Sequence, residues 1–488
     1  YILAFMPYGT NDKTWTSCVS NGINSSYEEM ANASDFSQKE NSPVQSTPGG
    51  GIAYRKYKVA GGAQKEYLFG EGFSSDSIGL SEEWWQMFGD TTLNRIVTTA
   101  LAKNKNILQA ISRIEQSKAA LRSARSQYLP SVSLGRSAGV QGNGSIVQQY
   151  IVEPMVSWEI PLFGMLKNNT DIARADIAYA EWQYRGVELS LAAQVATTYF
   201  TLLQYRRDLD IARRSAHLRE MSAVLIDSLF VRGMASGVNR EQAYNLLYTA
   251  QADIPLYERS VKQTLLSLDL LMGKSADSTA YTTNSATLIT DYKPIYIPTG
   301  LPSELLYRRP DVMSAYQQLS AAVAKAKNAR AARFPSFALT AEGGFTSADI
   351  GKLFTKGSWL WNALLSMTQP IYNFGGLRSG ERVAIEQYNQ ALYAYQQSFL
   401  QAVSDVENAL LSISTYRAES ERYRELVESN KRIAELTMSL YRNGLSAYLD
   451  VIDAERTLYN SQMQYSNIVA QQYINYINLC KARPRRDL

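Results

Sequence analysis

The chain has 488 residues, and its 49 Lys and Arg residues nearly balance its 45 Asp and Glu residues. This balance gives no general reason to expect a nucleic-acid partner. One histidine and two cysteines are too few for a typical zinc site or a histidine-dependent catalytic system, and the sequence holds no phosphate-binding loop or dinucleotide fingerprint. We therefore expect no enzyme, no cofactor and no bound metal.

The same order of motifs occurs twice along the chain, which indicates an internal duplication. Residues 124–131 resemble residues 329–336, and Pro161-Leu-Phe-Gly resembles Pro370-Ile-Tyr-Asn-Phe-Gly. Each copy continues into a long polar segment without proline that ends near a glycine, Gly233 or Gly444. We expect an extended arm at 1–80, a first repeat at 81–272, a linker at 273–302, a second repeat at 303–482 and a tail at 483–488.

Long helices are predicted in both repeats. In the first, Leu191, Val195, Thr198 and Leu202 begin a series with alternating steps of four and three residues, which is typical of a heptad seam. A glycine-containing turn and a returning helix follow, so we expect antiparallel helical pairs. The predicted helices are 90–128, 167–232 and 240–272 (kinked at Pro255) in the first repeat, and a helix before the hairpin, 378–442 and 447–482 in the second.

Two β-hairpins are predicted, over 130–161 and 335–372, because apolar and polar residues alternate there. Pro154 cannot donate to a strand ladder, so we expect a bulge or an edge position at that residue. Arg136 falls on the otherwise apolar face of its segment. The glycine-bearing tips are predicted near Gly142-Asn143-Gly144 and between Gly343 and Gly357.

The strands allow two interpretations, a soluble sheet packed on helices or a sheet in a membrane. No apolar run is long enough for a helical span. Trp158, Trp359 and Trp361 near strand ends would suit the aromatic girdle of an outer membrane sheet, and each segment has about ten residues, as a tilted spanning strand needs. Because four strands cannot close a barrel and lipid does not tolerate open edges, the membrane interpretation requires several chains to share one barrel.

These features together resemble the outer membrane factors, the TolC-like outer membrane efflux proteins, especially the lipoprotein branch that serves resistance-nodulation-division pumps. The resemblance covers about residues 80–482 and rests on the duplicated plan, on residues 81–90, on Ala124–Pro130 and on Leu-Leu-Tyr-Arg-Arg-Pro-Asp-Val at 305–312. It implies an α+β membrane protein: a homotrimer with a twelve-stranded β-barrel, four strands per chain, in the bacterial outer membrane. A long antiparallel α-helical barrel would continue from it into the periplasm.

The resemblance also implies a function and partners. The protein would be the outer membrane channel of a tripartite efflux system, a passive exit duct for small molecules. Its partners would be outer membrane lipid, a periplasmic adaptor and an inner-membrane resistance-nodulation-division pump. A type I protein secretion duct and a structural coiled-coil protein with soluble hairpins remain the alternatives, and the sequence does not name the cargo.

A periplasmic gate is implied at the second helical turn, within Tyr441–Ala454. Asp450 and Asp453 share a helix face, and threefold symmetry would bring six carboxylates around the axis, where they can constrict a pore. The other interpretation is that both acids only favour the positive end of a helix. Ser446 departs from relatives that carry a basic residue at this position and use it to tie the closed state.

The helical turns are the implied docking surface for the adaptor. The residues concerned are Gly233, Ser236 and Asn239 in the first turn and Gly444 in the second, and Asn239 stands where the family often has an acid.

Two further segments match family features. In the signature Arg308-Arg309-Pro310-Asp311, proline suits the first turn of a helix and aspartate favours its positive end, so we expect a structural role. Cys18 is a candidate lipid anchor, although Trp15-Thr16-Ser17 before it departs from a good lipoprotein cleavage site.

Overall fold

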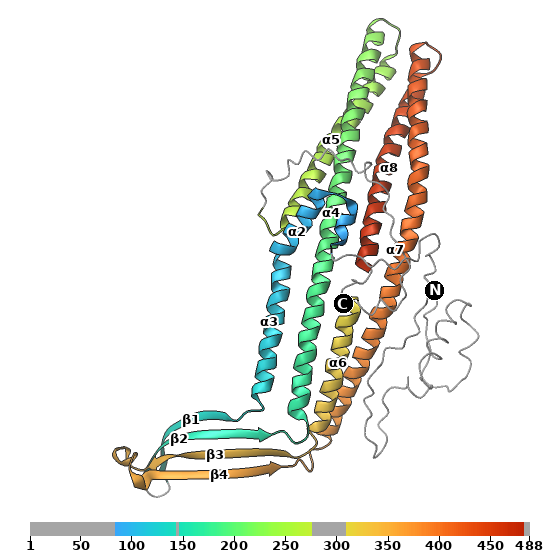
Figure 1. The fold of residues 1–488 in the computed structure, drawn as a ribbon. Helices are drawn as coiled ribbons and strands as arrows, with labels where there is room; N and C mark the ends of the chain where they lie inside the picture. The colour runs from blue at the N-terminus through green and yellow to red at the C-terminus, as the bar shows by residue number, and fades with distance from the viewer. Residues whose placement is uncertain (1–82, 143–145, 276–308, 483–488) are drawn as a thin grey trace, which may run out of the picture.

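The computed structural model describes residues 83–142, 146–275 and 309–482. The molecule is elongated, with a four-stranded sheet at one end and two helical turns at the other (Figure 1). The first part contains η1 (Trp84–Phe88), α2 (Thr91–Lys103), α3 (Lys105–Ser126), β1 (Ser131–Gly142), β2 (Ile146–Ile160), α4 (Met165–Val231) and α5 (Gly237–Leu271). The second part contains α6 (Pro310–Ala331), β3 (Ser336–Ser347), η5 (Ile350–Lys352), η6 (Lys356–Ser358), β4 (Trp359–Thr368), α7 (Gly376–Arg442) and α8 (Tyr448–Ala482).

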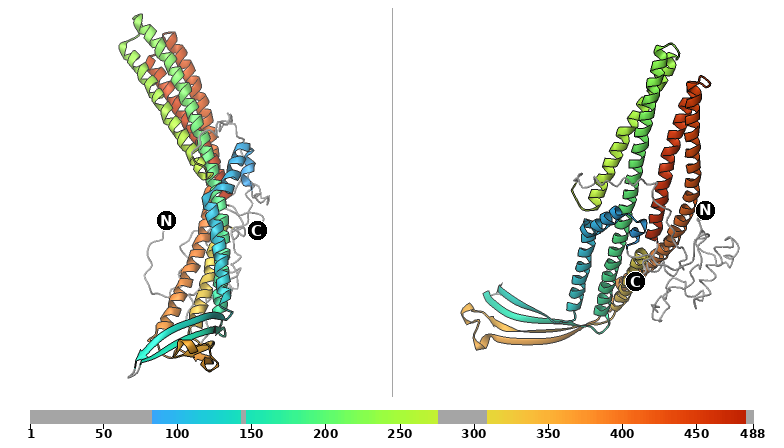
Figure 2. Two further views of the ribbon diagram at one scale, coloured as in Figure 1. Left: turned by 90° about the vertical axis from the view of Figure 1, so that its left-hand side faces the viewer. Right: turned by 45° about the horizontal axis from the view of Figure 1, so that its top comes forward.

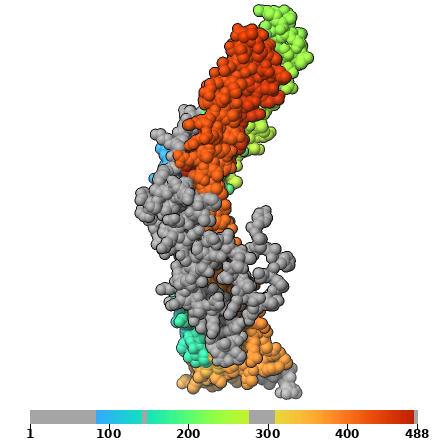
Figure 3. All heavy atoms as spheres, turned by 90° about the vertical axis from the view of Figure 1, so that its right-hand side faces the viewer, coloured from blue at the N-terminus to red at the C-terminus, as the bar shows by residue number. Residues whose placement is uncertain are grey.

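The two halves of the chain repeat one helical plan. Helices α4 and α7 each have 67 residues, and α5 and α8 each have 35. At 1.5 Å per residue, α4 and α7 are each about 100 Å long. The α4–α5 and α7–α8 hairpins lie side by side and end close together (Figures 1 and 2), and α7 and α8 form much of one long face (Figure 3). No described helix is both long and apolar enough to cross a membrane.

The prediction of one helix over 90–128 is wrong, because the helix is interrupted at Asn104. The backbone of Asn104 is extended. Its side-chain Nδ2 donates to the Leu271 carbonyl over 2.7 Å, and its side-chain Oδ1 accepts from Asn106 N over 2.8 Å. An asparagine side chain that bonds to backbone groups in this way competes with the helical ladder. The chain therefore ends α2 and starts α3 in a new direction.

The sheet is antiparallel throughout, in the order β1-β2-β3-β4. Pro154 lies in the central strand β2 opposite Leu134, so the predicted edge position is wrong. The β2–β3 register is the same on either side of Pro154, at Val152 and Met155, which excludes the predicted bulge. The strands meet closely there because Gly344 has no side chain: a Cβ atom would lie 2.2 Å from the Val152 carbonyl oxygen.

The tip of the second hairpin is shorter than predicted. Gly343 and Gly344 belong to β3, and the connection to β4 covers 348–358 with the short helices η5 and η6. The predicted tip of the first hairpin falls partly outside the described residues, at 143–145.

The register places most of the large apolar residues of the four strands on one face, which we name the apolar sheet face, while Ile151, Met155, Leu360 and Leu364 lie on the other. Trp361 and Met367 are 72% and 62% exposed in the single chain, so this face is not covered by the helices. The opposite face carries Ser, Thr, Gln and Glu side chains. The apolar sheet face comprises Val132, Leu134, Ala138 and Val140 of β1; Tyr150, Val152, Pro154, Val156, Trp158 and Ile160 of β2; Phe337, Leu339, Ala341, Gly343 and Phe345 of β3; and Trp359, Trp361, Ala363, Leu365 and Met367 of β4.

The largest buried core lies near the middle of the long helices. Trp84, Trp85 and Phe88 of η1 pack there against α4 and α8. The rings of Phe200 and Tyr473 stack at 5.1 Å with an angle of 7° between their planes. Aromatic pairs in this geometry add to the burial of their surface, so η1 fixes α4 to α8 at this level.

Candidate functional site at the helical tips

The two helical turns are built in the same way. At the end of α4, Met234 N donates to the Leu229 carbonyl over 2.8 Å and Gly233 N donates to the Phe230 carbonyl over 2.9 Å. The equivalent bonds at the end of α7 start from Leu445 N and Gly444 N. Both glycines have φ 73°, which a residue with a side chain rarely adopts. Each pair of bonds is a Schellman motif, and it gives both turns a defined backbone.

The helices after the turns begin with different capping interactions. The Ser236 hydroxyl accepts a 3.2 Å hydrogen bond from Asn239 N at the start of α5. In the second copy, the Asp450 carboxylate accepts a 3.1 Å hydrogen bond from Ala447 N, just before α8. A complete capping box has both of these bonds, one to the side chain of the N-cap residue and one from its backbone N–H. The first copy has only the former bond, and the second copy has only the latter. Asp450 therefore has a structural partner as well as an exposed position.

The remaining predicted gate residues surround Asp450 on the same turn. Asp453 is exposed, and its carboxylate has neither a hydrogen bond nor an ion pair with any residue that the structure describes. The Tyr441 and Tyr448 rings lie 5.3 Å apart, and burial raises the pKa of both phenols. The Ser446 hydroxyl oxygen is buried without a hydrogen-bond partner in the described chain. The structure thus brings Tyr441, Ser446 and Asp450 together, with Asp453 one helical turn further.

A small hydrophobic cluster, which we name the tip core, joins the two hairpins below the turns. Tyr441, Tyr244 and Leu229 are partly buried against it. The cluster unites residues from α4, α5 and α8, so the two tips cannot separate without exposing apolar surface. The tip core consists of Ala223, Ile226, Ala243, Leu246, Leu247, Tyr448, Val451 and Ile452.

Comparison with known proteins assigns this architecture. The profile of the Outer membrane efflux protein family matches residues 96–274 and 301–483. The chain belongs to this family. It is 30% identical over 456 residues to the toluene efflux pump outer membrane protein TtgF of Pseudomonas putida, covering 91% of this chain and 92% of TtgF. It is 28% identical to the probable outer membrane lipoprotein SilC of Salmonella typhimurium, covering 82% and 87% of the two chains.

Solved structures agree with this membership. The structure of CusC, described as a transmembrane channel, superposes with a TM-score of 0.76 at 26% identity, over 84% of this chain and 96% of that chain. The resemblance drawn from the sequence is confirmed. The protein is an efflux channel of the bacterial outer membrane, with its long helices in the periplasm. Its family consists of channel proteins rather than enzymes.

Next to the tip core, this efflux protein contains a buried polar network that the sequence analysis missed. Arg219 of α4 is only 4% exposed, and its Nη1 donates to the Leu246 carbonyl of α5 over 3.1 Å. Its guanidinium lies 5.1 Å from the centre of the Tyr459 ring of α8. Tyr459 in turn donates to the Asp253 carboxylate of α5 over 2.7 Å. One arginine therefore contacts two other helices.

Glu455 of α8 is the acidic partner in this network. The Ser222 hydroxyl donates to its Oε1 over 3.3 Å. Burial raises the pKa of the Glu455 carboxyl, and the charge of Arg219 and the Ser222 hydrogen bond partly offset that rise. Burial also lowers the pKa of the Arg219 guanidinium, although Glu455 opposes this. Because both groups are desolvated, the charge of each is stabilised by the charge of the other.

A signal for this network was present in the sequence. The heptad series through Ala212 and Ala216 continues at Arg219, Ala223 and Ile226, all of which are buried. An arginine at a seam position differs from Arg213, which is exposed and pairs with Glu258 on the surface.

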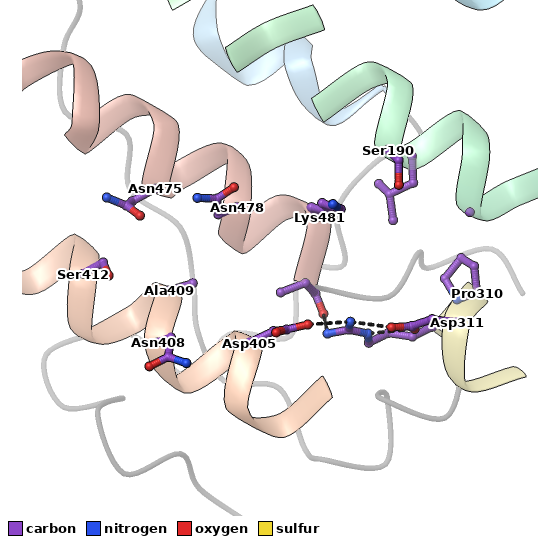
Figure 4. Close-up of a pocket in the computed structure, with 14 residues that line it drawn as sticks. Ser190, Pro310, Asp311, Asp405, Asn408, Ala409, Ser412, Asn475, Asn478 and Lys481 are labelled. Carbon is purple, nitrogen blue, oxygen red and sulfur yellow. Dashed lines mark hydrogen bonds and ion pairs between the residues drawn. The ribbon is translucent and has the colours of Figure 1, made fainter. Parts of the chain in front are cut away.

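The family signature forms a second charged centre, near the middle of the molecule (Figure 4). Arg309 is 6% exposed, and its guanidinium binds Asp311 at 2.7 Å and Asp405 at 2.9 Å. It also donates to the carbonyls of Ala402 and Ala482, each over 3.3 Å. These bonds tie the start of α6 to α7 and to the end of α8, beside a cavity of about 370 Å³.

The rest of the signature has the geometry expected of a helix start. Pro310 occupies the first turn of α6, and Asp311 follows it there. Arg308 and Cys18 lie outside the described residues.

Proposed function

We propose that three copies of the chain form one exit duct, with a twelve-stranded barrel in the outer membrane and a helical barrel in the periplasm. The observation that carries this proposal is the apolar sheet face together with the two outer strands. In the described chain, β1 and β4 each pair on one side only. In lipid, the unpaired backbone groups of such edges would be very unfavourable, and neighbouring copies would satisfy them.

The helical part would carry cargo across the periplasm. Helices about 100 Å long with polar surfaces suit a conduit through water, and the charge balance of the chain favours no particular cargo class. An inner-membrane pump of the resistance-nodulation-division type would deliver small molecules through a periplasmic adaptor. The duct itself would be passive, with Cys18 as the proposed lipid anchor.

The tips would close this duct at its periplasmic end. Repeated three times, the exposed Asp453 and the capping Asp450 would place six carboxylates around the axis. Tyr441 and Ser446 would stabilise the turn by packing inside the tip, because the Tyr441 ring contacts the tip core and the Ser446 hydroxyl oxygen is buried. Since the tip core joins both hairpins, opening would move them together, as in an iris.

The two turns would dock the adaptor. Around Gly233, Ser236, Asn239 and Gly444, the apolar side chains Met234, Val238 and Leu445 are 63%, 65% and 74% exposed. Exposed apolar residues on a rigid turn are typical of a protein interaction surface.

The assembly is tested by the mass of the full-length protein in detergent. The proposal predicts a particle that contains three 54.5 kDa chains and resists dissociation by mild heating. A stable monomer in detergent, or a chain that stays in solution without detergent, would contradict it.

A further inference from the structure

Arg136 is the only charged residue that the register of the described strands places on the apolar sheet face. Arg136 is exposed, and its guanidinium has no hydrogen bond or ion pair with another described residue. The proposed trimer gives it no role. An arginine on a lipid-facing surface is unfavourable at the bilayer centre and is tolerated near the interface, where its head group reaches polar lipid groups.

The sheet register gives the position of Arg136 along the strands. Arg136 pairs with Val152, Val152 pairs with Phe345, and Phe345 pairs with Trp359, so the four lie in one row across the strands. This row is at the end of β3 and β4 that is farther from the helices, and β1 and β2 continue beyond it to Gly142 and Ile146 (Figure 1). Because the helices are periplasmic, the row faces the outer leaflet.

Aromatic residues mark this row as an interface. The Phe345 ring lies 5.3 Å from both the Trp359 and the Phe354 rings. From Trp359 to Met367 the strand rises about 26 Å along its own axis. At the tilt of about 40° that is typical of outer membrane barrels, this corresponds to a height of about 20 Å, which covers most of an apolar band of about 25 Å. Trp158 lies toward the helical end, where its Nε1 donates to the Tyr128 carbonyl over 3.0 Å. Arg136 therefore lies in the row where the apolar residues of β3 and β4 end.

The connection between β3 and β4 adds two lysines beyond this row. Lys352 and Lys356 are exposed, and neither forms an ion pair within the described chain. The loop that carries them is ordered, since the Ser358 and Thr355 hydroxyls donate to the Lys352 carbonyl over 2.8 and 2.9 Å. The acid of this loop, Asp349, accepts from Gly351 N over 2.9 Å and so caps η5.

We propose that Arg136, Lys352 and Lys356 form a cationic rim that binds the phosphate groups of a phosphorylated glycolipid in the outer leaflet. The inference rests on the proposed placement of the sheet in the outer membrane. Arginine matches phosphate with two parallel hydrogen bonds, and lysine supplies a compact charge. The exposed Phe354 and Trp361 provide apolar surface beside the acyl chains. Charge and apolar surface thus favour a lipid over a free anion.

The test is native mass spectrometry of the full-length protein in detergent, with diphosphorylated lipid A as the probe. The rim variant is Arg136→Gln/Lys352→Gln/Lys356→Gln. The matched control, Lys325→Gln/Lys431→Gln/Arg432→Gln, removes three exposed cations from α6 and α7. We expect lipid retention by the rim variant to be lower than that of the wild type by a factor of about five or more. The control should retain as much lipid as the wild type. Dephosphorylated lipid A should bind weakly to all three proteins.

Three results would overturn the inference: equal retention by the rim variant, equal retention of the dephosphorylated lipid, or complete displacement by millimolar inorganic phosphate. The loop variant Lys352→Gln/Lys356→Gln leaves the strands unchanged and should still show a partial loss, which guards against misfolding. Planar-bilayer conductance of the same samples separates the two proposals. Failure of both the wild type and the Asp450→Asn/Asp453→Asn variant to conduct speaks against the duct, whereas conductance without lipid retention speaks against the rim alone.

Discussion

The Ser222 hydroxyl of α4 donates a 3.3 Å hydrogen bond to the Glu455 carboxylate of α8, and so links the two halves of the chain beside the tip core. Arg219 lies in the same network and contacts α5 and α8. A buried charged group depends strongly on its partners, because water cannot replace them. The network should therefore hold the α4–α5 hairpin against the α7–α8 hairpin.

Replacing Arg219 should loosen the tips. Arg219→Met removes the guanidinium but keeps a long side chain. It removes the hydrogen bond to the Leu246 carbonyl and the positive charge that interacts with Glu455. We expect a loss of about 2 kcal/mol of unfolding free energy. Amide hydrogen exchange of residues in the tip core should accelerate, while exchange near η1 stays unchanged. Arg213→Met, at an exposed surface pair, is the control, and equal protection of the tip core in both variants would contradict a role of the network.

Asp208 should make stability depend on pH. Burial raises the pKa of its carboxyl from 3.8 to about 6, and the nearby Ser466 and Gln204 side chains offset only part of that rise. The folded protein therefore binds this proton more tightly than the unfolded chain. Between pH 4 and 6, the contribution of Asp208 to unfolding free energy should fall as pH rises, by about 3 kcal/mol in total.

The matching experiment compares melting temperatures in detergent between pH 4 and 7. Asp208→Asn should be more stable than the wild type at pH 7, and the difference should shrink toward pH 4. Asp210→Asn serves as the control, because Asp210 forms a surface pair with Arg214. A pH dependence that is identical in the wild type and Asp208→Asn would refute the assignment.

The turn glycines should not tolerate a side chain. Gly444→Ala forces alanine to adopt φ 73°, which costs about 1 kcal/mol, and Gly233→Ala should behave alike. Space is not the reason, since a Cβ atom at either glycine would meet nothing within 4 Å. Thermal unfolding should show the loss, and Gly380→Ala, within α7 and also in open space, should show none. Equal stability of all three variants would argue against the backbone explanation.

Arg309 should not be replaceable by lysine. Lysine keeps the charge but cannot bind Asp311 and Asp405 while also reaching the carbonyls of Ala402 and Ala482. We expect Arg309→Lys to lower the unfolding free energy by about 2 kcal/mol. The exposed Arg422→Lys, whose partner is Glu425, should change it by less than about 0.5 kcal/mol. If Arg309→Lys proved equally mild, the signature would have another role.

Periodicity and turn chemistry explain why much of the architecture could be predicted. The heptad series of α4, the alternation in β3 and the glycines of both turns each specify a local structure. What was missed depends on contacts between distant residues. Asn104 interrupts a helix because Leu271 accepts its hydrogen bond. Pro154 lies in a central strand next to Val152 and Glu153, which Gly344 of β3 approaches closely.

The candidate site was predictable only in part, for the same reason. The positions of Asp450 and Asp453 on one face follow from helical spacing, but the capping bond of Asp450 needs the turn geometry. Likewise, Arg219 is close in the sequence to Arg213 and Arg214, which are surface residues. Its burial follows from packing against α5 and α8.

We propose above all a channel that acidic residues close at its tips. The most direct measurement is planar-bilayer conductance of the purified protein beside the Asp450→Asn/Asp453→Asn variant. Asparagine keeps an acceptor oxygen for Ala447 N, so the variant removes charge while preserving the cap. We predict small or rare openings for the wild type, and large, steady openings for the variant. Equal conductance in the two proteins would contradict the gate, and no conductance in either would contradict the channel.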